Sequence, residues 1–163
     1  GAYGGELKDV ITNVQMLTQD GEVLRLDNAS MAFGYRTSIL KKMPYIVTEV
    51  EIVLQQGDRE EIRATMDDLA KKRREKQPLE FPSAGSTFKR PEGHFAGALI
   101  MNAGLRGFRV GDAQVSEKHC GFVINKGNAT AEEIRTLIED VQMKVKESFG
   151  VVLEPEVIFV GDF

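Results

Sequence analysis

A long amphipathic segment at residues 130–150 constrains the fold of this chain more than any other feature. Thr130 and Glu133 form a T-x-x-E capping box, which is typical of a helix start, and Gly150 is the residue type that most often follows a helix end. Between them, apolar side chains recur at helical spacing, at Ile134, Leu137, Ile138, Val141, Val145 and Phe149. The pattern predicts a helix with one buried face, and that face requires another layer of secondary structure to cover it.

Strand patterns occupy the first third of the chain. Residues 10–27 approximate a period-two alternation around Asp20-Gly21, a pair that favours a hairpin turn, so this segment predicts a β-hairpin. Residues 28–33 predict a short helical turn. Residues 45–54 predict a further strand with one half-exposed face.

A second helical pattern begins at Asp58, whose side chain is suited to a helix N-cap. The cationic run KKRREK at the far end is typical of a solvated helix terminus, because positive charge there suits the helix dipole. Pro78 and Pro82 end the pattern and open a Pro- and Gly-rich loop, which we take as the boundary between two units. The predicted buried face of this helix is an apolar stripe of Ile62, Met66, Leu69 and Ala70.

Shorter elements fill the rest of the chain. The sequence predicts a helix from about residue 94 to 103 that ends at Gly104, strands at 108–110 and 121–125, and a final strand at 151–160. Helices and strands are mixed without a regular βαβ rhythm. The predicted fold class is therefore α+β.

Composition excludes several function classes. A net charge of -4 and a pI near 5.3 argue against a nucleic-acid partner, because binding phosphate backbones needs a basic face. One cysteine and two histidines make a metal site improbable. Every apolar run is too short to span a bilayer, so we expect no membrane partner and a cytoplasmic protein.

Three residues are candidates for chemistry. Arg36, in FGYRTS, can hold a carboxylate through two parallel hydrogen bonds, or it is a surface arginine packed on Tyr35. Ser86, in SAGS, is either an ordinary turn residue or a proton donor assisted by nearby cations. Glu156 either lies on the exposed face of an edge strand or, as a protonated carboxyl, donates a hydrogen bond to a developing oxyanion.

The adjacent pair His119-Cys120 permits a metal or thiol interpretation. A small core cysteine beside a turn histidine is the favoured one, because free cysteine behaves as a buried apolar residue.

Several blocks of the sequence, taken in order, resemble the later part of the UDP-N-acetylenolpyruvoylglucosamine reductases, the MurB flavoenzymes of bacterial cell-wall synthesis. The blocks are GAYGGELKDV, FGYRTSIL, RREKQPLEFPSAGSTFKRPEGHFAGALI, AGLRGFRVGDAQVSEKH, FVIN, NATAEEI and FGVVLEPEVIFVG. The resemblance covers nearly the whole chain, and its several ordered blocks make it more specific than any single motif.

The resemblance implies an oxidoreductase with FAD as cofactor and NADPH as hydride donor. In that family the reduced flavin passes a hydride to the enolpyruvyl double bond of a UDP-sugar, and UDP-N-acetylmuramate results. Ser86 matches the serine that protonates the neighbouring carbon. Arg36 and Glu156 match the residues that polarise the substrate carboxylate and stabilise the enol-like intermediate.

The resemblance also implies binding residues. Two phosphates need cationic partners, which accounts for basic residues gathered in an acidic chain. The implied cofactor-binding residues are Gly1, Ala2 and Gly4, and the implied substrate-binding residues are Tyr3, Arg73, Lys76 and Lys89.

Domain organisation follows from the same resemblance. Residues 1–80 correspond to the second half of an FAD-binding domain, residues 81–150 to a substrate-binding domain, and residues 151–163 to a strand that returns toward an N-terminal region missing from this sequence. The chain lacks an initiator methionine and opens on a Gly-rich turn, so we expect it to be the C-terminal portion of a longer protein.

Some positions depart from the family pattern. The segment between Arg36 and Ser86 is too short for the lid insertion of one subfamily, so the chain resembles the lidless type II branch. The departures leave the catalytic trio intact but put the finer nucleotide contacts in question, and they are Arg90, Asp112, Cys120 and Ile158.

The sequence leaves open an alternative of another class, a non-catalytic nucleotide-sugar-binding domain that keeps the fold without the flavin. A different flavin oxidase with the same fold is a weaker alternative.

Overall fold

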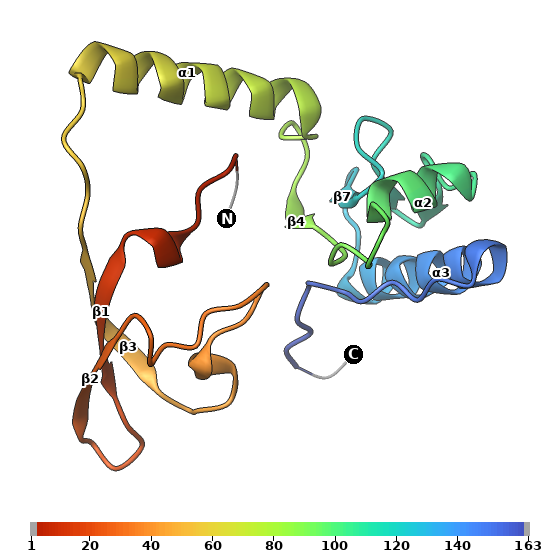
Figure 1. Cartoon of the computed structure of the whole chain (residues 1–163). Coiled ribbons are helices and arrows are strands. Elements are labelled where there is room, and N and C mark those ends of the chain that lie inside the picture. Colours follow the sequence, from red (N-terminus) through yellow and green to blue (C-terminus); the bar gives the residue numbers. More distant parts are fainter. Residues whose placement is uncertain (1–2, 162–163) are drawn as a thin grey trace. The chain divides into compact units, whose positions relative to one another are not determined.

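The structure is a computed structural model that describes residues 3–161. The chain divides into two compact units, Gly1–Arg59 and Glu60–Phe163. Figure 1 shows the elements of each unit, and both units combine short antiparallel sheets with helical segments. The predicted α+β class is confirmed, whereas the predicted boundary at residue 80 and the domain roles stay predictions.

The first unit is built on the predicted hairpin. Strands β1 (Ile11–Leu17) and β2 (Val23–Asp27) pair antiparallel, and Gly21 at the turn has a φ of +83°, which explains the glycine. Strand β3 (Ile46–Ile52) pairs with the other side of β1, giving the order β2-β1-β3.

The strands of this sheet have one polar and one apolar face. On the polar face Glu51 accepts hydrogen bonds from Asn13 (2.9 Å) and Arg25 (2.5 Å). On the other face, residues of the segment between β2 and β3 pack on the buried Val14 and Met16, including the 3-10 helix η2 (Ile39–Lys41). A second 3-10 helix, η1 (Leu7–Asp9), precedes β1.

The second unit begins with helix α1 and continues into a four-stranded antiparallel sheet of order β4-β7-β6-β5. The bounds of its elements are α1 (Arg59–Lys76), β4 (Ser83–Ser86), α2 (Ala96–Asn102), β5 (Arg109–Val110), β6 (Ala113–Val115), β7 (Phe122–Asn125) and α3 (Ala131–Phe149).

Helix α3 confirms the pattern that constrained the fold. The Thr130 hydroxyl accepts from the Glu133 N–H (3.1 Å), the Glu133 carboxylate accepts from the Thr130 N–H (3.0 Å), and Gly150 ends the helix at φ +69°. The apolar face packs on β5, β6 and β7 in one core with α2 and Leu153. Phe149, at the end of the helix, is 41% exposed, contrary to prediction.

Other sequence predictions were wrong. Residues 83–86 form a strand rather than a loop, because they pair with β7. The short strand β6 was missed, and residues 151–160 form no regular strand, only an isolated bridge between Pro155 and Phe88. The predicted apolar stripe of α1 is not a buried face, because Ile62 and Met66 are exposed.

Within residues 3–161, no helix is both long and apolar enough to cross a membrane.

Candidate functional site

The first unit contains a cleft of about 710 Å³. Its walls are the glycines and charged residues around η1 on one side and the loop that follows β2 on the other. The residues that line it include Gly4, Gly5, Glu6, Lys8, Asp9, Tyr35, Arg36 and Lys41.

Arg36 lines this cleft from the tip of a tight turn. Gly34 and Thr37 exchange two backbone hydrogen bonds of 3.0 and 3.2 Å, which leaves Tyr35 and Arg36 as the two turn residues. Arg36 has a φ of +55°, and its guanidinium carbon lies 5.3 Å from the centroid of the Tyr35 ring. A non-glycine residue in this conformation costs about 1 to 2 kcal/mol, and such strain is most often retained at functional positions. Arg36 therefore packs on Tyr35, as one of the two interpretations predicts, and also lines a cleft.

The cleft carries charges of both signs. Lys8 pairs with Glu6 (2.9 Å), and the pKa of Lys8 is raised mainly by its hydrogen bond to Glu6 and then by the charge of that carboxylate. The Glu6 N–H donates to Asp9 (2.9 Å), which holds η1 in place. Lys8 and Lys41 are not predicted from the sequence, because nothing in the pattern separates them from solvated surface lysines.

The predicted cofactor-binding residues lie at the start of this unit. Gly4 lines the cleft with a φ of +84°, and a Cβ there would meet nothing within 4 Å, so backbone conformation rather than crowding requires the glycine. Tyr3 has a φ of +52° and is 52% exposed. Gly1 and Ala2 lie outside the described residues.

In the second unit, Ser86 and Glu156 lie on adjoining backbone segments. Ser86 ends β4 and pairs with Phe122 of β7. The Glu156 N–H donates to the carbonyl of Thr87, the next residue along, at 2.8 Å. Ser86 and Glu156 are 70 positions apart in sequence, yet Glu156 is hydrogen-bonded to the residue that follows Ser86.

Thr87 anchors this arrangement. It is buried, its N–H donates to the Gly121 carbonyl (2.8 Å), and its hydroxyl accepts from the Val123 N–H (3.0 Å). Gly85, at φ +86°, lies at the register shift of β4 that precedes Ser86. The Ser86 hydroxyl makes one long hydrogen bond, to the Phe88 carbonyl (3.4 Å). The position of the residue is therefore set mainly by the pairing of its backbone with β7.

The predicted cationic residues differ in their surroundings. The Lys89 N–H donates to the Glu154 carbonyl (2.8 Å), and the two side chains also form an ion pair in which Lys89 is 25% exposed. Arg73 and Lys76 lie on the exposed last turn of α1. Arg36 belongs to the other unit, so its convergence with Ser86 and Glu156 stays a prediction.

Two of the positions that depart from the family pattern, Arg90 and Asp112, have local partners. The guanidinium of Arg90 stacks on the exposed ring of Phe95, 4.1 Å from its centroid. Asp112 accepts from Arg109 (3.0 Å) and from the Asn128 N–H (2.8 Å), so it closes a loop beside the sheet. Ile158 is 78% exposed.

The pair His119-Cys120 is structural in this chain. Cys120 is buried in the core, as the favoured interpretation predicted. Nδ1 of His119 accepts from the Gly121 N–H (3.1 Å), and the imidazole lies edge-on to Phe122 with ring centroids 5.1 Å apart.

Comparison with known proteins agrees with this fold. The family model described as the C-terminal domain of UDP-N-acetylenolpyruvoylglucosamine reductase matches residues 77–160. The reductase of Lachnoclostridium phytofermentans is 56% identical over 162 residues, which are 99% of this chain and 52% of that protein. The reductase of Agathobacter rectalis is 57% identical over 163 residues, which are 100% of this chain and 52% of that protein.

A solved structure is similar as well. The UDP-N-acetylenolpyruvylglucosamine reductase (MurB) of Thermus caldophilus superposes with a TM-score of 0.81 at 36% identity, covering 96% of this chain and 56% of that one. This chain therefore spans about half the length of the relatives it matches. Because the family model matches more than half of its residues, and the resemblance seen in the sequence is thereby confirmed, the chain belongs to the UDP-N-acetylenolpyruvoylglucosamine reductase family.

Proposed function

We propose that this chain is the C-terminal half of a cytoplasmic enzyme that reduces UDP-N-acetylenolpyruvoylglucosamine to UDP-N-acetylmuramate with FAD and NADPH, a step of peptidoglycan precursor synthesis. The observation that carries the proposal is the backbone hydrogen bond from Glu156 to Thr87, the residue after Ser86, in a chain that is 56% identical to a named reductase over almost all its length. Backbone hydrogen bonds thus bring together the two chain segments that carry these residues, which supports a shared site.

The cleft of the first unit fits part of an FAD. Its lining includes peptide groups at Gly4 and Gly5 and the cations Lys8 and Arg36, which can donate to a pyrophosphate or a flavin carbonyl. The carboxylates of Glu6 and Asp9 lie in the same lining. The cleft volume of about 710 Å³ is large enough for part of a dinucleotide. When bound, FAD supplies the hydride that adds to one carbon of the enolpyruvyl double bond.

The residues of this chain manage the charge and the proton. In the proposal, the Arg36 guanidinium holds the substrate carboxylate through paired hydrogen bonds, and Glu156 donates a hydrogen bond to the oxygen on which charge builds. Ser86 transfers its hydroxyl proton to the carbon next to the one that receives the hydride. One hydride and one proton are added, so the double bond becomes saturated and charge balances once the serine regains a proton from solvent.

The remaining predicted residues bind the nucleotide. Lys89, Arg73 and Lys76 are proposed to contact the diphosphate, and Tyr3 to contact the substrate. Lys89 shares its charge with Glu154, so a diphosphate would compete with that carboxylate for the ammonium group.

The test uses the full-length protein. We expect the purified enzyme to carry a yellow flavin that NADPH bleaches and that the enolpyruvyl substrate restores in colour, measured by absorbance. A colourless protein that binds UDP-sugars and shows no NADPH oxidation would instead support the non-catalytic binding domain.

We also propose that the region carried by the relatives but missing from this sequence pairs with β3. This strand is an edge of its sheet, and all of its residues are exposed. Apolar side chains are exposed along β3, with Ile46 at 65% and Ile52 at 50%, and Leu54 just beyond its end is 75% exposed. An open edge with exposed apolar side chains favours pairing with a further strand, and about half of each relative's length is available to supply one.

A matched pair of substitutions tests this proposal. Ile46 of β3 and Val23 of β2 pair with the same residue of β1, Leu17, and their side chains are 65% and 64% exposed. We expect Ile46→Asp to lower the unfolding free energy of the full-length protein by about 2 to 3 kcal/mol, because it buries an unpaired charge. Val23→Asp should change the unfolding free energy of the full-length protein by less than about 0.5 kcal/mol. In the present chain alone, each of the two substitutions should also change the unfolding free energy by less than about 0.5 kcal/mol.

Urea-induced unfolding measures the unfolding free energy of the full-length protein and of the present chain. Equal small losses for Ile46→Asp in the two lengths would show that β3 faces solvent in the complete protein, and the pairing would then be wrong.

A further inference from the structure

Helix α1 is weakly anchored to the rest of the second unit. None of its residues is buried. Ion pairs within the helix, such as Arg63 with Asp67 (3.2 Å) and Lys72 with Asp68 (2.6 Å), join residues of the same helix and leave its position undefined. The position of its last turn, which carries Arg73 and Lys76, must therefore depend on a few contacts near its C-terminal end.

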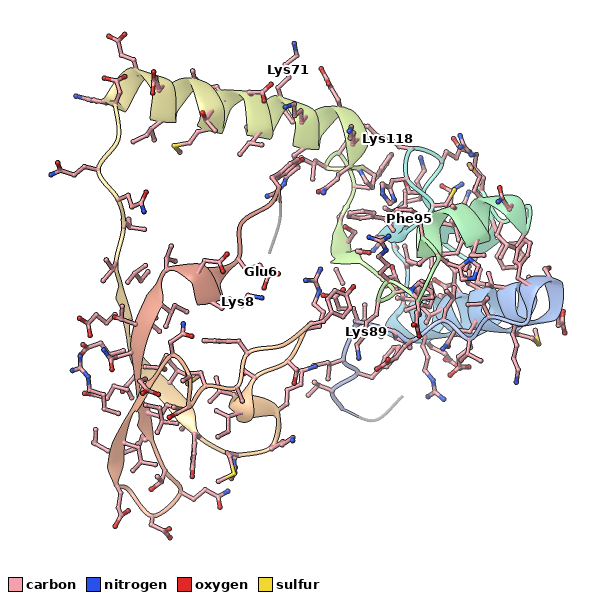
Figure 2. All side chains as sticks on the ribbon, in the orientation of Figure 1. Glu6, Lys8, Lys71, Lys89, Phe95 and Lys118 are labelled. Atoms are coloured by element: carbon pink, nitrogen blue, oxygen red, sulfur yellow. The ribbon has the colours of Figure 1, made fainter. Side chains whose placement is uncertain are left out.

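Lys118 supplies such a contact from the turn between β6 and β7. Its Nζ donates to the Arg74 carbonyl (2.8 Å) and lies 3.4 Å from the Glu80 carboxylate. Figure 2 shows Lys118 beside the C-terminal end of α1, whereas Lys71 points away from it. Carbonyls of a last helical turn lack intrahelical partners and carry partial negative charge, so an ammonium group there satisfies one of them and suits the helix dipole.

The turn that carries Lys118 is itself rigid. The N–H groups of Lys118 and His119 donate to the hydroxyl of Ser116 at 3.2 and 3.3 Å. Ser116 is buried, and its own N–H donates to the Phe122 carbonyl (2.9 Å). The ammonium group thus extends from a fixed point of the sheet.

The segment after α1 is also fixed to the second unit. Pro78 is fully buried, Lys126 lies 4.0 Å from the Phe81 ring centroid, and the Asn125 N–H donates to the Pro82 carbonyl (2.9 Å). The pKa of Glu80 is lowered, first by a hydrogen bond from its own backbone N–H and then by the charges of Lys118 and Lys126. Glu80 is therefore ionised at neutral pH, and Lys118 links this fixed segment to the last turn of the helix.

We infer that Lys118 is a positioning residue that holds the last turn of α1 and so presents Arg73 and Lys76 to the diphosphate of the UDP-sugar. The inference rests on the proposed function. Long cationic side chains on an unanchored turn lose more freedom when they bind a ligand than side chains on a turn already fixed, and this loss weakens binding. Because Lys118 fixes the turn before the substrate binds, less conformational freedom is lost on binding.

The experiment uses full-length enzyme with Lys118→Met. We expect the KM for the UDP-sugar to rise about tenfold, as for the loss of one charge-assisted hydrogen bond, while kcat and the rate of flavin reduction by NADPH stay within about twofold. Hydrogen exchange of a peptide covering residues 70–80 should become faster, because the Gln77 N–H bonds to the Arg73 carbonyl in this turn (2.9 Å). Lys118→Arg should restore most of the affinity, since a guanidinium also donates to a carbonyl.

Two controls separate positioning from other roles. Lys71→Met removes one positive charge from an exposed side chain of the same helix, and it should leave KM within about twofold. In an enzyme already carrying Arg73→Met and Lys76→Met, adding Lys118→Met should change KM no further, because the residues through which it acts are gone.

Each contrary result has a distinct meaning. A further tenfold rise in KM in the Arg73→Met and Lys76→Met enzyme would show that Lys118 contacts the substrate itself, which overturns the positioning role. An unchanged KM in Lys118→Met, in an enzyme that turns over normally, also overturns it. A wild-type enzyme without reductase activity would overturn the proposed function and this inference together.

Discussion

Replacing Ser86 with alanine in the full-length enzyme is expected to slow reoxidation of the reduced flavin by the enolpyruvyl substrate roughly 10²- to 10⁴-fold, the usual contribution of a positioned acid. Reduction of the flavin by NADPH should keep its rate, because no proton goes to the substrate in that half-reaction. Stopped-flow absorbance measures the two half-reactions separately. The fold should survive the change, since the Ser86 hydroxyl makes only a long bond to the Phe88 carbonyl (3.4 Å).

The same strand offers a matched control. Ser83 begins β4, and its hydroxyl accepts a hydrogen bond from the Gly85 N–H (3.4 Å). Ser83→Ala removes the same atom from the other end of β4 and should leave both half-reactions within about twofold. Equal losses in the two half-reactions of Ser86→Ala would contradict its role as proton donor.

Elements with strong local signals were predicted well. The capping box at Thr130, the αL glycine at 150 and the turn at Asp20-Gly21 each satisfy backbone groups within a few residues, so the sequence around them suffices. Elements that depend on distant partners were not. The sequence predicts a loop at β4, because its Ser, Ala and Gly residues have low strand propensity, and only pairing with β7 makes it a strand.

The opposite error occurred at the end of the chain. Residues 151–160 are apolar enough to predict a strand, yet they make one isolated bridge, at Pro155, because no further strand among residues 3–161 pairs with them regularly. Helix α1 shows the same dependence. Its apolar stripe has helical spacing but lies exposed, so hydrophobic periodicity predicted the helix correctly and its burial wrongly.

The candidate site divides in the same way. Residue types and family resemblance predict Ser86, Arg36 and Glu156 as site residues, but only the hydrogen bond from Glu156 to Thr87 shows that the backbone segments of the first and last adjoin. No local pattern marks the positive φ of Arg36, since it follows from the bridge between Gly34 and Thr37. Lys118 was missed because its partner is a backbone carbonyl 44 residues away, which residue identity does not reveal.

Glu156 can be tested without disturbing the backbone hydrogen bond that places it. Its N–H is held by the Thr87 carbonyl (2.8 Å), so a side chain of the same shape leaves the backbone pairing intact. Glu156→Gln keeps the size of the group and replaces the acidic O–H of the proposed protonated carboxyl with a much less acidic amide N–H. We expect this substitution to lower the rate of flavin reoxidation by substrate roughly 10²-fold or more, as when one group that stabilises a developing oxyanion is removed.

Glu154 provides the control, because it lies on the same segment and can receive the same substitution. Its side chain is 69% exposed and pairs with Lys89, and an exposed pair of this kind contributes about 0 to 1 kcal/mol. Glu154→Gln should therefore change the reoxidation rate at saturating substrate by less than about fivefold. If Glu156→Gln were no slower than Glu154→Gln, the carboxyl at position 156 would have no part in the chemistry, and the charge that builds on the substrate would be stabilised by Arg36 alone or by residues outside this chain.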